Sequence, residues 1–278
     1  MLLPVLITAL LGISFGSFIN ALVWRLHQQE VLEKKNIKSD QNLSILTGRS
    51  MCPNCHHKLS GFDLIPILSW LLLRGKCRYC KQKISFQYPL VETLTLLASL
   101  LYLSFWHDKN SIVGISELIL QLLTLYGLIS LFIYDMRWYK LPTRIIYGLY
   151  FFVIPYQFMI FYHSNNKFSF LSNLFISALI GGGLFYVLHI ISNGKWIGGG
   201  DVRLGFLLGL SLGNPIKSIL LIFISSLLGS LVGVFLIIFK KLNKKSLIPY
   251  GPFLILSYFL VQLFGNIIIS WARNHYLI

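Results

Sequence analysis

The sequence contains few acidic residues and few charges of either sign. Asp and Glu together number nine among 278 residues, and charged residues of all kinds make up 12%. A soluble domain carries about twice that charged fraction, so the composition argues against one. The hydrophobic fraction is 55% and the mean hydropathy is +0.71. The composition therefore predicts a polytopic membrane protein rather than a soluble domain with a single anchor.

The first apolar run lacks the features of a cleavable signal peptide, because it has no basic start and no small-residue cleavage site after it. A membrane-spanning helix needs about 20 apolar residues. We expect an all-α transmembrane bundle of about eight spans, at residues 2–24, 84–106, 113–134, 145–162, 170–191, 202–213, 216–239 and 249–271. The sixth segment is short, so seven spans remain an alternative.

The net charge is +15, and its distribution points to a membrane rather than to nucleic acid. With eight spans and residues 25–83 in the cytoplasm, 20 of the 24 Lys and Arg residues lie on the cytoplasmic side. Basic residues concentrate on that side of membrane proteins. The expected surrounding partner is therefore membrane lipid, and no nucleic-acid partner is expected.

All four cysteines lie in the only long polar segment. Cys52 and Cys55 form one CxxC pair, Cys77 and Cys80 form another, and 21 residues separate the pairs. Two such pairs can complete a tetrahedral Zn²⁺ site, with the two histidines after Cys55 as alternative ligands. Disulfides and redox chemistry of one pair are the competing explanations, and a cytoplasmic location disfavours disulfides. Four thiolates leave no position for water, so the predicted zinc is structural.

Two aspartates occur where membrane proteins rarely place a charge. Asp135 ends the apolar run LISLFIYD, and Asp201 follows Gly198, Gly199 and Gly200 at the start of another run. An ionisable residue at such a position is a functional hypothesis by default. Two carboxylates within a few Å share one proton, so one can activate water while the other polarises a carbonyl. The glycines would let the backbone approach a substrate closely.

Simpler roles are available for both aspartates. Asp135 can pair with Arg137 or Lys140 at the membrane interface, and Asp201 can cap the helix that begins there. A transporter could also use the carboxylates for proton coupling. The inverted repeats and broken midplane helices of transporters are not evident in the sequence.

Six segments follow one another along the chain in the order of a known family. They are GSFINALVWRL (Gly16–Leu26), CPNC (Cys52–Cys55), LIPILSWLLLRGKCRYCKQKISFQYPLVE (Leu64–Glu92), Asp135 with Leu141-Pro142, GGGDVRL (Gly198–Leu204) and IPYGPFL (Ile248–Leu254). Together they resemble the bacterial type IV prepilin peptidases, which are membrane aspartic proteases of the GxGD class. The resemblance covers nearly the whole chain. Trp138-Tyr139-Lys140 departs from the acidic or polar residues expected there.

The resemblance implies specific roles. Asp135 and Asp201 would be the catalytic aspartates of an endopeptidase that removes the leader of prepilins or pseudopilins at the cytoplasmic face of the bacterial inner membrane. The four cysteines would bind structural Zn²⁺. Many members of the family also methylate the new N-terminus with S-adenosylmethionine. The candidates for binding that cofactor are Gly16, Asn20, Arg25 and Glu92.

These roles divide the chain into a first transmembrane helix (1–24), a cytoplasmic zinc loop (25–83) and a membrane-embedded peptidase core (84–278). An inactive scaffold for the assembly of a pilus or secretion system is a further alternative. It would hold pilins through the zinc loop without cleaving them.

Overall fold

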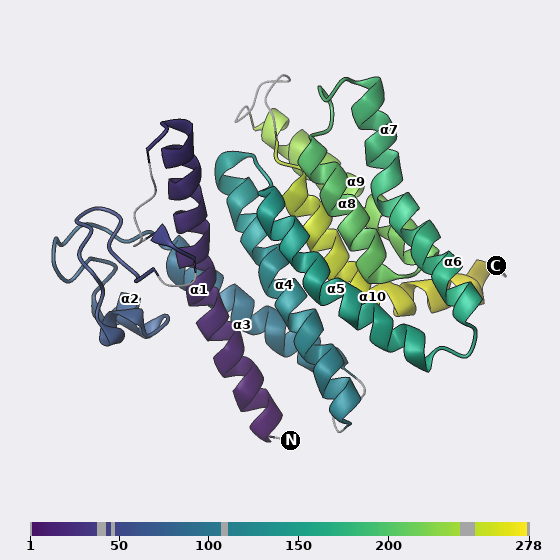
Figure 1. Cartoon of the computed structure of the whole chain (residues 1–278), viewed down its shortest axis with the longest axis horizontal. Coiled ribbons are helices and arrows are strands. Elements are labelled where there is room, and N and C mark those ends of the chain that lie inside the picture. The colour runs from purple at the N-terminus through teal and green to yellow at the C-terminus, as the bar shows by residue number, and fades with distance from the viewer. Residues whose placement is uncertain (1, 38–42, 46–47, 107–110, 240–247, 277–278) are drawn as a thin grey trace. The chain divides into compact units, whose positions relative to one another are not determined.

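The computed structural model describes residues 2–37, 43–45, 48–106, 111–239 and 248–276 (Figure 1). Within these residues the regular elements are all helical, as the composition predicts. The chain divides into two compact units, Met1–His107 and Asp108–Ile278. Six of the lysines on which the predicted charge bias depends, at 38, 109, 240, 241, 244 and 245, lie outside the described residues.

In the first unit, the helix α1 (Leu2–Lys34) packs along α3 (Gln87–Phe105). Glycines allow this close approach, because a Cβ atom at Gly16 would lie 2.7 Å from the Glu92 Cα and one at Gly12 would lie 2.8 Å from the Ser99 Oγ. Small residues at helix contacts are typical of membrane bundles. The short helices η2 (Gly61–Leu64) and α2 (Leu68–Leu72) lie between α1 and α3 in the chain. The compact unit Met1–His107 therefore contains both α1 and α3. The predicted functional boundary at residue 84, which would assign α3 to the peptidase core, stays a prediction.

The second unit is a bundle around one short helix. Its elements are α4 (Ile112–Trp138), α5 (Thr143–His163), α6 (Lys167–Ala178), the π-helical turn η3 (Leu179–Gly183), α7 (Leu184–Ile191), α8 (Gly199–Leu212), α9 (Pro215–Ile238) and α10 (Gly251–Tyr276). The helix α8 contacts α5, α6, η3, α7, α9 and α10, and Figure 1 shows it among them. Its side chains Leu204, Leu207 and Leu208 are fully buried in the core of this unit. The second unit is therefore organised around α8.

Seven helices of the described chain are long and apolar enough to cross a membrane: α1, α3, α4, α5, the continuous run α6–α7, α9 and α10. They coincide with seven of the eight predicted spans, although α1 continues past residue 24 to Lys34. The remaining prediction, 202–213, falls in α8, which has 14 residues. At 1.5 Å per residue α8 is about 21 Å long, shorter than the roughly 30 Å hydrocarbon core. The all-helical membrane architecture is confirmed, with α8 enclosed by other helices.

The C-terminal end of α8 is capped by side chains from other helices. The last carbonyl groups of a helix need donors, and lipid supplies none. Gln157 of α5 donates its Nε2 to the carbonyl oxygens of Leu210 and Ser211, at 2.7 and 2.8 Å. Ser177 of α6 donates its hydroxyl to the Gly209 carbonyl at 2.7 Å. These bonds allow α8 to end inside the bundle.

Replacing Gln157 by leucine should destabilise the second unit, because two buried carbonyl groups lose their donor. Each unsatisfied group costs about 1–3 kcal/mol. In a protein of this size each kcal/mol lowers the melting temperature by about 2–4 °C. Thermal unfolding in detergent micelles measures the effect.

The matched control is Gln262→Leu, which makes the same change at a half-buried position of α10. Equal melting temperatures for Gln157→Leu and Gln262→Leu would show that the capping bonds contribute nothing.

Candidate functional site

Asp135 and Asp201 come together although 66 positions separate them in the chain. Asp135 lies in the last turn of α4 and is 4% exposed, while Asp201 lies in the first turn of α8 and is half-buried. The carboxylate of Asp201 is close enough to interact electrostatically with that of Asp135. Two acidic groups from separate helices therefore lie near enough for the charge of one to affect the other.

Glycine backbone borders each carboxylate. The N–H of Gly251, at the start of α10, donates to the Asp135 carboxylate. A Cβ atom at Gly251 would lie 2.6 Å from the Asp135 Oδ2, so no larger residue fits there without displacing the acid. The N–H of Gly198 donates in the same way to Asp201. Sequence reasoning did not assign Gly251 to the site, although its segment Ile248–Leu254 carried part of the resemblance.

The bond from Gly198 to Asp201 is also a helix cap. Gly198 is the N-cap residue of α8, and an acidic side chain in the first turn that accepts from the N-cap N–H stabilises the helix. The capping role predicted as the simpler alternative is therefore present. It holds the side chain of Asp201 at the start of α8, within electrostatic range of Asp135.

Leu141 connects the two glycine segments. A Cβ atom at Gly200 would lie 3.0 Å from the Leu141 Cβ, and one at Gly251 would lie 3.2 Å from the Leu141 Cδ2. Leu141 therefore lies between the backbone that precedes Asp201 and the backbone that contacts Asp135. The predicted glycine run has a packing role here, because the side chain of Leu141 fills the space beside Gly200.

The segment Trp138-Tyr139-Lys140 ends α4 immediately after Asp135. Tyr139 has a φ of 56° in the left-handed region, and its N–H donates to the Asp135 carbonyl oxygen at 2.9 Å. The guanidinium of Arg137 lies 5.4 Å from the Trp138 ring centroid, in cation–π geometry. This departure from the family pattern therefore forms the C-terminal cap of α4.

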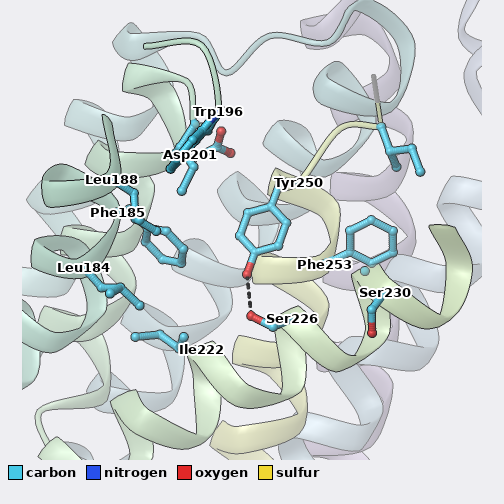
Figure 2. Close-up of a pocket in the computed structure, with 13 residues that line it drawn as sticks. Leu184, Phe185, Leu188, Trp196, Asp201, Ile222, Ser226, Ser230, Tyr250 and Phe253 are labelled. Carbon is cyan, nitrogen blue, oxygen red and sulfur yellow. Dashed lines mark hydrogen bonds between the residues drawn. The ribbon is translucent and has the colours of Figure 1, made fainter. Parts of the chain in front are cut away.

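A cavity of about 450 Å³ borders Asp201 in the second unit. We call it the α7–α9 groove, and its lining residues include Leu184, Phe185, Trp196, Asp201, Ile222, Ser226, Gly229, Ser230, Tyr250 and Phe253. Figure 2 shows Asp201 beside Trp196 at one end and Leu184 with Ile222 at the other. The hydroxyl of Tyr250 is hydrogen-bonded to Ser225 at 2.8 Å and to Ser226 at 3.3 Å. The groove is thus mainly apolar, with a carboxylate at one end.

His189 of α7 is a second residue near the site that sequence reasoning did not select. Its Nδ1 lies 2.7 Å from the carbonyl oxygen of Ile197, directly before the glycine run. Its ring also lies beside Gly194 and Gly199, since Cβ atoms built there would lie 3.2 and 3.8 Å from the His189 Cε1. His189 therefore holds the loop that leads into α8.

The four cysteines gather as the spacing predicts. Their Sγ atoms all lie within 4.8 Å of one another, and the Sγ atoms of Cys52 and Cys80 are 3.9 Å apart. A tetrahedral site with Zn–S bonds of about 2.3 Å has sulfur atoms about 3.8 Å apart, so the arrangement fits Zn²⁺. The group contains neither predicted histidine alternative, and the ring of His57 packs on Tyr79 with centroids 3.7 Å apart.

The two CxxC turns have the same backbone design, 25 positions apart. In the first, the Cys52 N–H donates to the His57 carbonyl oxygen, and in the second the Cys77 N–H donates to the Gln82 carbonyl oxygen. The residue after each pair has a positive φ, with 54° at His56 and 59° at Lys81. A hydrogen bond from the backbone of Gln82 contributes most to lowering the pKa of Cys80 to about 6, which favours the thiolate that a metal binds.

Three of the four residues predicted to serve methylation meet at the contact between α1 and α3. Gly16 packs on Glu92, and Asn20 donates its Nδ2 to the carbonyl oxygens of Gly16 and Tyr88 at 3.3 and 3.2 Å. The Glu92 Oε2 accepts the N–H of Ile67 at 2.6 Å. Asn20 is 4% exposed and Glu92 is 5% exposed.

The fourth residue, Arg25, has other partners. Its Nη1 donates to the carbonyl oxygens of Ser44 and Ile45, both at 3.3 Å, and so holds the chain after α1. Ile67, which Glu92 contacts, has a φ of 61°, which is unusual for a β-branched residue.

Comparisons with known proteins match both units. Residues 10–107 match the family model described as the bacterial peptidase A24 N-terminal domain, and residues 122–234 match the type IV leader peptidase family. A relative from Legionella pneumophila, named prepilin leader peptidase/N-methyltransferase, is 32% identical over 98% of this chain and 95% of its own length. Relatives of the same name from Aeromonas hydrophila and Vibrio cholerae are each 29% identical, over 96% and 91% of this chain and 93% and 94% of their own lengths. No solved structure matches the chain significantly.

Proposed function

The chain belongs to the type IV leader peptidase family, and on that premise we propose that Asp135 and Asp201 are its catalytic pair. The function is the proteolytic removal of prepilin leaders, followed by N-methylation. One observation supports the assignment of the pair most strongly. The carboxylate of Asp201 lies at the end of an apolar groove and interacts electrostatically with that of Asp135, which comes from a separate helix of the second unit.

The pair would hydrolyse the peptide bond by acid–base catalysis. The ionised carboxylate takes a proton from water, whose oxygen then attacks the scissile carbonyl carbon, while the protonated carboxylate donates to the carbonyl oxygen. Collapse of the tetrahedral intermediate breaks the C–N bond, and a proton from the pair passes to the leaving amine. The backbone N–H groups of Gly198 and Gly251 hold the two carboxylates in place.

The first unit would supply the methylation half. Gly16, Asn20 and Glu92 are proposed to form the binding region for S-adenosylmethionine, which provides the methyl group when bound. Arg25 is proposed to support this region by holding the chain after α1. The four cysteines are proposed to bind Zn²⁺ that orders the loop between α1 and α3, since a segment with so small a core gains its folding energy from the metal.

The helices support a multi-pass membrane protein. We propose the bacterial inner membrane as its location, with the zinc loop and the aspartates at the cytoplasmic face, because the basic residues favour that orientation. Prepilins and pseudopilins are the proposed substrates. The family membership leaves the transporter and scaffold alternatives without support.

Asp135→Asn and Asp201→Asn should each lower leader removal by at least about 100-fold, because an amide can neither accept the proton from water nor share one. Cleavage of a prepilin by the purified variant in detergent measures the effect. Glu117→Gln makes the same acid-to-amide change near the other end of α4 and should leave the rate unchanged. Normal cleavage by either aspartate variant would overturn the assignment.

Metal analysis of the purified protein should find about one Zn²⁺ per chain, as four thiolate ligands require. Cys77→Ser should lower both the zinc content and the protein yield, since it removes one of the buried ligands. His57→Ala should keep the metal, because His57 lies outside the ligand group. A metal-free parent protein, or disulfides between the pairs, would disprove the zinc site.

Glu92→Gln should separate the two activities. Loss of a charged hydrogen-bond acceptor costs about 1.5–3 kcal/mol, so methylation should fall about ten-fold or more while leader removal persists. Mass spectrometry of a co-expressed pilin N-terminus reports both steps together. Glu33→Gln, on the exposed end of α1, is the control. Full methylation by Glu92→Gln, or equal loss of both steps, would contradict the proposed role.

A further inference from the structure

We infer that the α7–α9 groove seats an apolar helix of the substrate and that Gly229 sets how closely this helix approaches α9. The inference rests on the proposed function and extends it, because it identifies the surface that aligns the substrate with Asp201. The groove ends at Asp201, so a segment lying in it leads directly to the carboxylate pair. Figure 2 shows this arrangement.

The groove has the dimensions of a helix contact. Along α9 its lining runs from Ile222 to Ser230, a distance of eight residues or about 12 Å, which is a little over two helical turns. On the opposite side Leu184 and Leu188 of α7 stand one turn apart. An occupant helix would therefore contact the groove over two turns before reaching Asp201.

The surroundings of the groove favour a helical occupant over an extended one. It is formed by α7, α9 and the start of α10, which all belong to candidate membrane spans, and Leu184 is 46% exposed at its edge. A peptide that enters from lipid must satisfy its own backbone hydrogen bonds, and a helix does so. Trp196 is 73% exposed beside Asp201, and aromatic side chains of this kind favour the membrane–water interface. The substrate helix would thus end at the interface, where water reaches the aspartates.

The small residues of α9 point to a helical partner. Ser226, Gly229 and Ser230 lie on the groove side, and small residues allow helices to pack closely in membranes. Gly229 is not required by the packing of this chain, because a Cβ atom there would lie 3.6 Å from Phe253 and 3.7 Å from Tyr250, in ordinary contact. By contrast, a Cβ atom at Gly181 would lie 2.7 Å from the Gly205 carbonyl oxygen. The absent side chain at position 229 therefore leaves space that the fold itself does not use.

Gly229→Leu should fill the groove and lower kcat/KM for a full-length prepilin at least ten-fold, mainly through KM. Gly148→Leu makes the same change on α5, where nothing lies within 4 Å of the added Cβ, and should leave kcat/KM unchanged. Gly229→Ala should give a smaller loss in the same direction, and it keeps the test valid if the leucine variant unfolds in detergent. Parental kcat/KM for both substitutions at position 229 would overturn the inference.

Photocrosslinking measures the contact between the groove and the prepilin independently of cleavage. A photoreactive phenylalanine analogue at Ile222 should crosslink to the apolar segment of the prepilin, whereas the same analogue at Phe151, exposed on α5, should not. Equal labelling at both positions, or labelling of lipid or of a second copy of this chain at Ile222, would reject the inference. If the protein with the analogue at position 222 crosslinks to the prepilin but the parent protein cleaves no prepilin, the proposed function fails and the groove stands. If the parent protein cleaves normally but the analogue at position 222 does not crosslink to the prepilin, the groove fails and the function stands.

Discussion

Backbone groups at the ends of a helix must find hydrogen-bond partners inside the protein when lipid surrounds it, and α8 shows how this bundle meets that constraint. At one end the Asp201 carboxylate accepts the N–H of Gly198, and at the other Gln157 and Ser177 donate to the last carbonyl groups. With both ends satisfied, a helix too short to span the bilayer keeps a fixed depth. Asp201 therefore has a fixed depth as well.

Close backbone contacts fix α8 laterally. Gly205 and Gly209 of α8 face η3 and the end of α6 so closely that a Cβ atom at either position would collide with the neighbouring backbone. On the side of the aspartates, Leu141 and Gly251 set the spacing between α4, α8 and α10. Contacts from most helices of the second unit thus determine where the Asp201 carboxylate lies. These contacts explain how Asp201 comes near Asp135, which is distant in sequence.

Much of this fold could be predicted from the sequence, because apolar runs of the right length are local signals. Seven spans were found, with every bound except the end of α1 within five residues, and the paired CxxC turns indicated the cysteine cluster. The remaining features depend on contacts between distant residues. Nothing near Gln157 shows that it caps a helix more than 50 positions away, and nothing near Gly251 shows that it contacts Asp135. The end of α1 was missed because its last turns are polar and leave the apolar pattern on which the prediction relied.

Ile67 adds a mechanical consequence to the first unit. A β-branched residue at φ 61° stores on the order of 1–3 kcal/mol, and the bond from its N–H to Glu92 opposes its relaxation. The hydrogen bond between Ile67 and Glu92 therefore holds this part of the loop against α3 in a strained backbone conformation. Loss of that hydrogen bond would remove one of the contacts that keep Ile67 in this conformation.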